Sequence, residues 1–472
     1  ELIQLEEQTA QADKILCERL TLYPQYIAER DAWLDNKLRA PVLHHADASG
    51  LARTDCWSAG EAAAENIPAA TPTRSNINPQ LQSIIDRAMD TETLQLDEIV
   101  ALFAARGNEL EQICAAADQL RRDVSGDTIR YVVNRNINYT NVCTYKCKFC
   151  AFSKGKTSES LRGTPYLVDL DEIARRTQEA WQRGATEICL QGGIHPAFTG
   201  QTYLDICATV KAAAPDIHVH AFSPLEVTHG AHTLGTSIEK FLQQLRDAGL
   251  GTLPGTAAEI LDDDVRKIIC PDKITTAEWL NVIRTAHEQD LRTTSTIMFG
   301  HLETSTSWAT HLLELRELQA DTGGITEFVP LPFVHMEAPM YRRGMARPGP
   351  TWREVLLMHA VARLALHPHI PNIQVSWVKL GAEGAGACLN AGANDLGGTL
   401  MNESISRAAG ADHGQEFCPE QMDALIQGIG RQAAHRDTLY RPVSAEQAKR
   451  SYNSAPLAEV VNRHAREYQI AS

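Results

Sequence analysis

The chain has 472 residues, of which 43% are hydrophobic and 22% charged, the balance of a globular protein with a substantial core. Its formal net charge of −15 provides no chain-wide basic field for a nucleic-acid backbone. The longest apolar stretches, such as VLLMHAVARLAL, are interrupted by His and Arg and are shorter than the roughly 18 residues of a membrane span, so we expect neither nucleic acid nor membrane as a partner.

The cysteine content favours a reducing compartment. The chain holds 11 cysteines, three of them clustered between positions 143 and 150 and the others scattered singly. Scattered single cysteines form no disulfide framework and mostly serve as small buried hydrophobes. We therefore expect a cytoplasmic protein.

The N-terminal part divides into a short head and a linker. Residues 1–59 contain a helical pattern, LEEQTAQADKILCERL, followed by turns with aromatic residues and proline, and they are too few for an independent domain. Residues 60–79 are rich in Ala, Pro, Thr and Asn without periodicity, which is typical of a linker. The first residue is Glu1 rather than Met, which is consistent with a fragment of a longer protein.

Residues 80–128 show apolar residues at helical spacing, in LDEIVALFAAR and LEQICAAADQLRRDV. Short β-rich runs then alternate with amphipathic helices over residues 129–440, and a tail follows over 441–472. The strands that we predict are Ile129–Asn134, Thr186–Leu190, Ile217–Phe222, Gly251–Leu253, Thr293–Phe299, Ile325–Pro330, Ile373–Lys379 and Gly397–Met401.

This alternation predicts an α/β fold, a (β/α)8 TIM-type barrel with an N-terminal helical extension, because parallel strands need helical crossovers and eight such units close on themselves. An intervening helix, DLDEIARRTQEAWQRG, has Asp169 as its expected N-cap and Gly184 at its end. An open doubly wound sheet is the alternative. In a barrel, chemistry lies in the loops after the carboxyl ends of the strands.

One such loop carries three cysteines, Cys143, Cys147 and Cys150, in the stretch NVCTYKCKFCAFSKGK. Structural zinc requires a fourth ligand, which a distant His or Cys would have to supply. An electron-transfer [4Fe–4S] cluster normally takes four cysteines as well. Three thiolates with one iron left open is the interpretation that fits best, because a catalytic metal needs an open coordination site.

The Cys-x3-Cys-x2-Cys spacing, with Phe149 before the last cysteine, resembles the signature of radical S-adenosylmethionine enzymes. The resemblance implies a [4Fe–4S] cluster whose open iron is chelated by S-adenosylmethionine, which is cleaved to a 5′-deoxyadenosyl radical. It also implies that Gly192 and Gly193, in QGGIHP, contact the methionine amino group through the backbone. A tight turn with positive φ would equally account for both glycines.

Three further segments at strand ends carry candidate site residues. PGTAAEIL, with Thr256 and Glu259, resembles a family segment that lines the adenosyl pocket, although Glu259 also fits an acid in the first turn of a helix. HAFSPLEV carries Glu226 and TIMFGH carries His301, both as weak catalytic candidates. A lone histidine is more often structural.

The wider match, over roughly residues 76–440, is to the tyrosine-condensing (CofH-type) half of FO synthase. It rests on NRNINYTNVCTYKCKFCAFSKGK, ICLQGGIHP, HAFSPLEV, STIMFGH and NDLGGTLMNESISRAAGA. The head, through CERLTLYPQYIAERDAWLD and GLARTDCWSAG, resembles the end of the cyclising (CofG-type) half. The menaquinone-pathway enzymes aminofutalosine synthase and dehypoxanthine futalosine cyclase share the general plan.

This resemblance implies a transferase that joins the 4-hydroxybenzyl fragment of L-tyrosine to 5-amino-6-(D-ribitylamino)uracil, in biosynthesis of the deazaflavin FO, the precursor of coenzyme F420. The implied partners are the cyclising half, fused or separate, and a ferredoxin- or flavodoxin-type reductant. Two alternatives stay open: a radical enzyme of the menaquinone (futalosine) pathway, and a non-catalytic iron–sulfur or zinc binding module.

A radical reaction needs shielding from water, and two stretches are candidates to close the site. They are SKGKTSESLRGTPY and PFVHMEAPMYRRGMARPGP. Their cations Lys156, Arg342 and Arg343 are candidates to hold the tyrosine carboxylate, although solvated surface charge accounts equally well for any one of them.

Overall fold

The computed structural model describes residues 2–12, 15–61, 78–153 and 164–464. Most of the linker predicted over 60–79, and Lys156 with most of its loop, therefore lie outside the described residues. None of the helices in the described ranges combines the length and the apolar character that a bilayer crossing requires.

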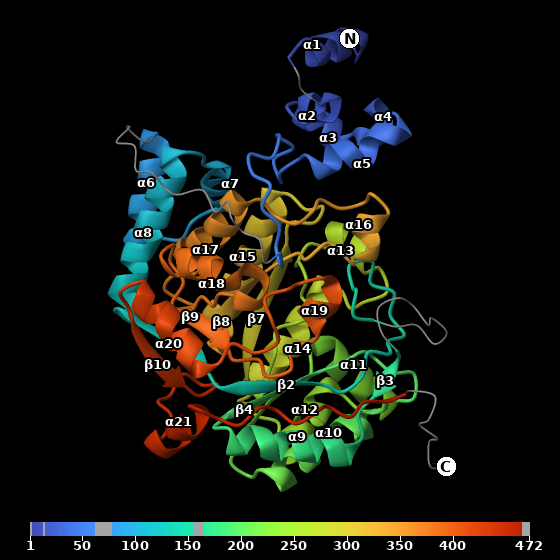
Figure 1. Cartoon of the computed structure of the whole chain (residues 1–472), viewed down its shortest axis with the longest axis vertical. Coiled ribbons are helices and arrows are strands. Elements are labelled where there is room, and N and C mark those ends of the chain that lie inside the picture. Colours follow the sequence, from blue (N-terminus) through green and yellow to red (C-terminus); the bar gives the residue numbers. More distant parts are fainter. Residues whose placement is uncertain (1, 13–14, 62–77, 154–163, 465–472) are drawn as a thin grey trace.

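A parallel sheet forms the centre of the molecule (Figure 1). Its strands follow one another in the order of the chain: β2 (Asn134–Asn138), β4 (Glu187–Gln191), β5 (His218–Ala221), β6 (Thr252–Leu253), β7 (Arg292–Phe299) and β8 (Ile325–Pro332). Single parallel bridges continue the ring, from Phe328 to Ile373, from Gln374 to Asp395, and from Met401 back to Arg135 on β2. The predicted TIM-type barrel is thus confirmed.

A second parallel sheet lies against the point where the ring closes. It has the order β10 (Gln432–Arg436), β1 (Thr128–Val132), β9 (Asp395–Gly398). A short antiparallel pair, β3 (Tyr166–Leu167) with β11 (Arg463–His464), lies outside both sheets. The first predicted strand, Ile129–Asn134, is therefore two strands, because the chain changes partners near Val133 from β9 and β10 to β4.

The prediction of a strand over Ile373–Lys379 is wrong in its second half. Ile373 and Gln374 pair with their neighbours, but Trp377 already begins a helix. A short buried apolar run has the same hydrophobic pattern as a strand or as a helix start, so periodicity alone does not separate the two. The Trp377 indole N–H donates to the Gly398 carbonyl at 2.8 Å, which ties this helix start to β9.

Helices follow the strands; most of them cover the outside of the barrel, and the short one over 405–409 lines a cavity at its mouth. They are α9 (Leu170–Gln182), α10 (Gly200–Ala213), α11 (Pro224–Thr233), α12 (Ile238–Asp247), α13 (Asp263–Ile269), α14 (Thr276–Glu288), α15 (Ser305–Thr322), α16 (Pro339–Arg342), α17 (Trp352–Leu366), α18 (Trp377–Leu389), α19 (Ile405–Ala409), α20 (Pro419–Gly428) and α21 (Ala445–Ser451). The Asp169 side chain accepts from the Glu172 N–H and begins α9 as predicted, while Gly184, with φ of 84°, ends it.

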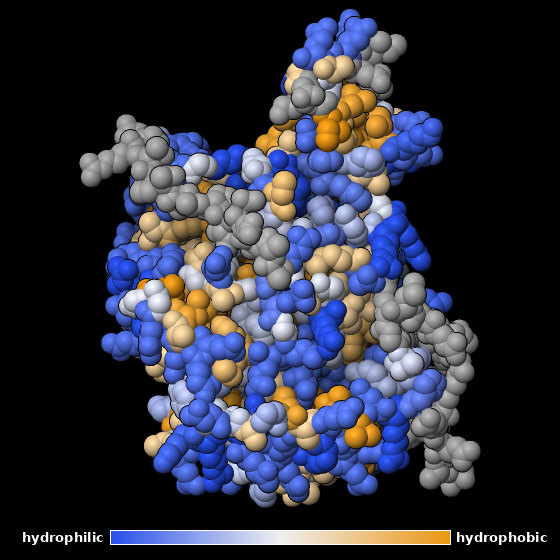
Figure 2. Space-filling view, viewed as in Figure 1, coloured by the Kyte–Doolittle hydropathy of each residue, from blue (hydrophilic) through white to orange (hydrophobic). Residues whose placement is uncertain are grey.

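Two groups of helices precede the barrel in the chain. The helices α6 (Pro79–Met89), α7 (Leu96–Ala104) and α8 (Asn108–Ser125) pack on one flank of the barrel, against α15 and α17 (Figure 1). The head contains α1 (Leu2–Gln11), α2 (Leu16–Leu20), α3 (Pro24–Ala28), α4 (Arg30–Trp33) and α5 (Asn36–His44). It projects beyond one end of the barrel and carries an apolar patch on its surface (Figure 2).

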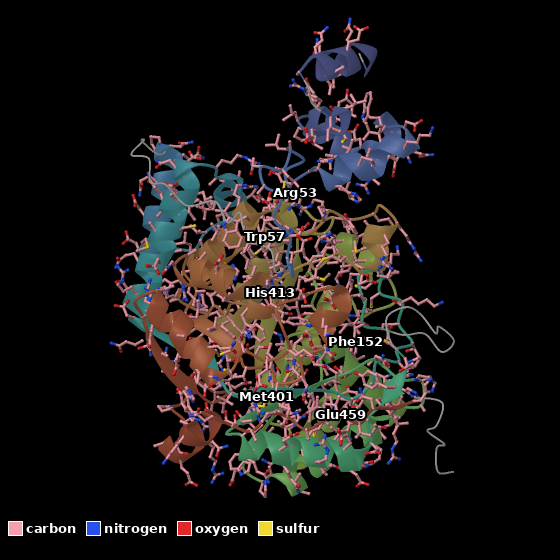
Figure 3. The ribbon with its side chains drawn as sticks, viewed as in Figure 1. Arg53, Trp57, Phe152, Met401, His413 and Glu459 are labelled. Atoms are coloured by element: carbon pink, nitrogen blue, oxygen red, sulfur yellow. The ribbon has the colours of Figure 1, made fainter. Side chains whose placement is uncertain are left out.

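The segment after α5 fastens the head to the barrel (Figure 3). The Arg53 guanidinium donates to the carbonyls of Gly349 and Pro350 at 2.8 and 3.1 Å. Trp57 is 6% exposed and packs on Trp352 with 5.3 Å between the ring centroids. Trp352 begins α17, so the head is joined directly to the helical layer of the barrel.

Candidate active site

The cysteine loop follows β2 and lies over the mouth of the barrel. Its backbone N–H groups hold it against two neighbouring segments. Thr144 donates to the Ile194 carbonyl after β4 at 2.9 Å, while Lys148 and Lys146 donate to the Ile269 carbonyl at the end of α13 and to the Asp272 carboxylate just after it, at 2.8 and 2.9 Å. Its course is therefore fixed by the protein itself. Cys143, Cys147 and Cys150 all line one cavity of about 270 Å³.

The donor set in this cavity fits an iron–sulfur cluster. Backbone N–H groups of Ile194 and Ser153 lie 3.4 and 3.3 Å from the sulfurs of Cys143 and Cys150, the kind of contact that cluster sulfurs accept. Burial raises the pKa of the Cys147 and Cys150 thiols, so the thiolate form depends on a bound cation. Within the described residues, no three His, Cys, Asp or Glu side chains stand in the arrangement that a single metal ion requires.

Gly192 and Gly193 line the same cavity, at the end of β4. Neither glycine has a positive φ, so a tight turn that requires positive φ does not explain why these two positions are glycine. A Cβ at Gly192 would collide with the Tyr139 ring, and one at Gly193 would collide with the Val142 carbonyl. Both glycines are thus needed for the close approach of β4 to the cysteine loop.

Glu259 and Phe149 meet a residue that the sequence did not single out, Lys273. The Lys273 ammonium lies 2.8 Å from the Glu259 carboxylate and 5.2 Å from the centroid of the Phe149 ring. Glu259 has φ of 50° and lies before α13, so it is not an acid in the first turn of a helix. Thr256 lines the cavity beside it, and its carbonyl accepts from the Trp279 indole at 3.1 Å.

Glu226 lines the cavity, but protein groups engage its carboxylate. It accepts from the Ser223 N–H at 2.7 Å and the Ser223 hydroxyl at 2.6 Å, and it also bonds the Tyr139 hydroxyl. Burial raises the pKa of this carboxyl. Glu226 therefore completes the cap at the start of α11 and positions Tyr139 next to Gly192.

His301, the other weak catalytic candidate, does not line this cavity. It is fully buried outside the cavity lining, and its Nδ1 lies 2.7 Å from the Glu303 carboxylate. Arg342 bonds Glu337 and lines a different cavity, while Arg343 is exposed. Neither arginine reaches the main cavity.

Lys379 is a second cation that the sequence did not single out. It lines the main cavity and its ammonium lies 3.3 Å from the Ser406 hydroxyl, and no carboxylate among the described residues is within ion-pair distance. Burial lowers the pKa of this amine, and the charge of Glu403 opposes the shift. The sequence does contain a signal for this residue: Lys379 lies within the apolar run VSWVKLG. Because lysine is rarely buried without a partner, a lysine in such a run is a candidate for ligand binding.

The main cavity continues into the barrel. A second cavity of about 210 Å³ shares Gln191, Thr256 and Lys379 with it. Alternate residues of the strands line this lumen, as the two-residue period of a strand requires. Among them are Asn134 and Asn136 of β2, Glu187, Cys189 and Gln191 of β4, Thr294 and Thr296 of β7, and Glu327, Val329 and Leu331 of β8.

An ion network forms the floor of the lumen. The Arg436 guanidinium, from β10, bonds the Asp395 carboxylate at 2.6 Å and the Glu327 carboxylate at 3.0 Å. The Tyr440 hydroxyl donates to the same Glu327 carboxylate at 2.5 Å. Burial raises the pKa of Glu327 to about 7 against the attraction of Arg436. Charged groups thus close the end of the barrel away from the cysteine loop.

Comparison with known proteins identifies two family regions in the chain. Residues 137–315 match the radical SAM superfamily, and residues 322–449 match the CofH/MqnC C-terminal region. The first region contains the cysteine loop and the strands β4 to β7. The second contains β8, the segments 373–374 and 395–401 that close the ring, and the ion network around Arg436 at the floor of the lumen.

Two relatives are similar to this protein over most of the chain. FO synthase of Streptomyces coelicolor is 44% identical over 93% of this chain, and the match covers 55% of that protein. A 5-amino-6-(D-ribitylamino)uracil–L-tyrosine 4-hydroxyphenyl transferase of Methanopyrus kandleri is 49% identical over 74% of this chain and 94% of its own length. The chain thus spans about half the length of the FO synthases that it matches.

Among solved structures, methylornithine synthase has a similar fold. Its TM-score is 0.59 at 17% identity, covering 74% of this chain and 97% of that protein.

Proposed function

Because this chain belongs to the radical SAM family that includes the FO synthases and their tyrosine 4-hydroxyphenyl transferase relatives, we propose that it transfers the 4-hydroxybenzyl fragment of L-tyrosine to 5-amino-6-(D-ribitylamino)uracil. The observation that carries the proposal is the cysteine loop placed over a cavity that continues into a polar barrel lumen. One end of this space can hold a cofactor and the other a polar substrate.

The predicted cofactors, a [4Fe–4S] cluster and S-adenosylmethionine, are those of the radical SAM superfamily. Cys143, Cys147 and Cys150 would hold the cluster, with the strand end at Gly192 and Gly193 beside it. Thr256, Glu259 and Phe149 line the same cavity and would contact S-adenosylmethionine. When bound, the pair supplies a primary carbon radical that removes a hydrogen atom from the substrate.

The protein's own groups then exclude water and orient the substrates. Lys379 lies where the cavity and the lumen join, and its ammonium has no carboxylate partner among the described residues. A buried ammonium without an anion is costly, so a ligand carboxylate is its natural partner. We assign it the α-carboxylate of tyrosine, in place of Arg342 and Arg343.

The proposed partners follow from the same family. They are the cyclising half of FO synthase, fused or separate, and a ferredoxin- or flavodoxin-type reductant. Residues 1–59 are proposed to be the end of that preceding half, followed by a linker over 60–79, the helical segment 80–128, the barrel 129–440 and the tail 441–472. The match to the long FO synthases over 93% of the chain, against 74% for the shorter transferase, supports this division.

The alternatives are not favoured. The relative at 49% identity is named as a tyrosine 4-hydroxyphenyl transferase, which favours the transfer reaction over the menaquinone (futalosine) alternative. A non-catalytic metal module gives no reason for a polar lumen beneath the cysteine loop.

An anaerobic assay tests the proposal. The cluster is reconstituted and reduced, S-adenosylmethionine is added, and tyrosine and the aminouracil are offered together and singly. We expect 5′-deoxyadenosine and a hydroxybenzyl–uracil adduct by mass spectrometry, with the adduct only when both substrates are present. Formation of 5′-deoxyadenosine with futalosine-type substrates alone would contradict the transfer reaction, and none with any substrate would contradict radical chemistry.

A further inference from the structure

The barrel lumen is polar where barrels of this kind are normally filled by branched apolar side chains. Glu187, Gln191, Thr294 and Glu327 all face it, together with asparagines of β2. Such a lining is costly unless each polar group has a hydrogen-bond partner. The hydrogen bonds of the lining therefore indicate which groups the protein satisfies itself and which await a ligand.

Three asparagines of β2 share the inner face of the strand, at positions 134, 136 and 138. Asn134 donates to the Glu187 carboxylate at 2.8 Å, and its carbonyl accepts from the Leu400 N–H at 2.8 Å. Asn138 accepts from the Ser404 hydroxyl at 2.9 Å and donates to the Gln191 carbonyl at 3.4 Å. The two outer amides thus bond to neighbouring strands and loops.

The middle amide differs from its neighbours. The side-chain carbonyl oxygen of Asn136 is buried without a hydrogen-bond partner, and no described residue bonds its amide nitrogen. Its backbone is fixed, because the Asn136 N–H donates to the Met401 carbonyl at 3.0 Å. Asn136 lines both the lumen and the cavity that Arg342 lines, so its side chain places a donor and an acceptor without a partner in the wall of the lumen, on a rigid strand.

A carboxamide is complementary to a group that offers one acceptor and one donor in the same plane. The imide edge of a uracil, a ring carbonyl next to the N3–H, is such a group, whereas the phenol of tyrosine offers a single hydroxyl. We propose that Asn136 binds the imide edge of the aminouracil acceptor and selects it as the second substrate. This inference rests on the proposed function and assigns one of its two substrates to the lumen.

The position of Asn136 agrees with this role. It lines the lumen with Gln191, which also lines the main cavity, so a ring bound to Asn136 lies next to the cofactor end of the site. Lys379 lies at the junction of the two cavities, so tyrosine would bind between the uracil and the cysteine loop.

Equilibrium binding to the full chain under anaerobic conditions tests the inference. The probes are 5-amino-6-(D-ribitylamino)uracil and its N3-methyl derivative, and the variants are Asn136→Ala, Asn136→Asp and, as a matched control, Asn281→Ala. Asn281 is exposed on α14. Two neutral hydrogen bonds are lost in Asn136→Ala, so we expect its Kd for the uracil to rise by about 10- to 100-fold.

The N3-methyl derivative should bind the unmodified chain as weakly as the parent binds Asn136→Ala, and the alanine variant should not distinguish the two probes. Asn136→Asp keeps the shape of the side chain and should also lose affinity, because the carboxylate repels the ring carbonyl. An unchanged Kd for the uracil in Asn136→Ala would overturn the assignment and indicate that a bound water satisfies the amide. A rise in the Kd for tyrosine alone would overturn it as well and indicate that tyrosine binds there.

The assay of turnover separates this inference from the proposed function. If the uracil binds through Asn136 but no 5′-deoxyadenosine forms, the proposed transferase activity is contradicted and the assignment of Asn136 stands. If Asn136→Ala does not change the rate of adduct formation, the proposed transferase activity stands and only the role of Asn136 in binding the uracil is contradicted.

Discussion

At the scale of single residues, the site depends on side chains whose burial is unusual for their type. Lysine is rarely buried without a carboxylate, yet Lys379 lies at the junction of two cavities with a hydroxyl as its bonded neighbour. Lys273, by contrast, has the Glu259 carboxylate at 2.8 Å. The two lysines therefore have different roles: Lys273 holds the wall of the cavity, and Lys379 is available to a ligand.

Lys379→Met should raise the KM for tyrosine by about 10- to 100-fold, because a hydrogen bond to a charged group contributes about 1.5–3 kcal/mol. Methionine keeps the length of the side chain and fits the apolar surroundings. Steady-state kinetics with varied tyrosine gives the change, and Lys240→Met, at an exposed position on α12, is the control. A weaker affinity for S-adenosylmethionine with unchanged KM for tyrosine would show that the ammonium holds the cofactor instead.

At the scale of elements, the end of β4 and the cysteine loop are fitted to each other. Gly193 donates its N–H to the Thr140 carbonyl at 2.9 Å, and the next residue, Ile194, bonds Thr144 and the Cys143 sulfur. The absence of a Cβ at Gly193 allows this approach. One strand end thus sets the position of one of the three clustered cysteines.

Gly193→Ala should therefore reduce the iron and sulfide bound per chain to less than half, because the new Cβ collides with backbone at Val142 and pushes the loop away. Iron analysis and the visible absorption of the reconstituted cluster measure the loss. Gly428→Ala is the control for glycine replacement, because nothing lies near the position of its Cβ and, like Gly193, it has no positive φ. Full cluster occupancy in Gly193→Ala would refute the steric argument.

The elements themselves were largely predictable from the sequence. Alternation of β-rich runs with capped helices gave β4, β5, β7 and β8 within two residues at either end, and Asp169 begins α9 as its side chain suggested. The prediction of a strand after Val375 was wrong, because a short apolar run does not show whether the chain forms a strand or a helix. The spacing of the cysteines is local and so was visible, whereas Lys273, Lys379 and Asn136 join the site only through the closure of the barrel.

His301 shows a second limit of the sequence. Its place at a strand end is the position from which catalytic residues of barrels come, yet its side chain is buried beside Glu303 and does not line the main cavity. Sequence gives the strand end but not the direction of the side chain beyond it.

At the scale of the whole molecule, the head is joined to the barrel by buried aromatic and polar contacts. Trp57 packs on Trp352, and the Ala48 N–H donates to the Glu354 carboxylate at 2.6 Å. Glu354 also bonds Arg347 and the Thr351 N–H at the start of α17. The head therefore shares its anchoring groups with the helical layer.

Trp57→Ala should cost about 3–5 kcal/mol at this junction, the usual range for removing a large buried aromatic side chain. We expect the head to become sensitive to limited proteolysis while the barrel stays resistant, with a lower Tm for the chain. Trp33→Ala is a matched control, because Trp33 is 52% exposed on the head. Equal proteolysis of the two variants would show that the Trp57–Trp352 contact does not hold the head.

The pairing of β1 has a consequence for the order of events in synthesis. β1 lies between β9 and β10, so both of its partners come from near the far end of the chain, and the floor residue Arg436 comes with them. Because a chain is made from its N-terminus, the three thiols leave the ribosome long before the chamber that receives their cluster exists. We therefore expect cluster loading to follow the pairing of the last strands rather than the synthesis of the cysteine loop.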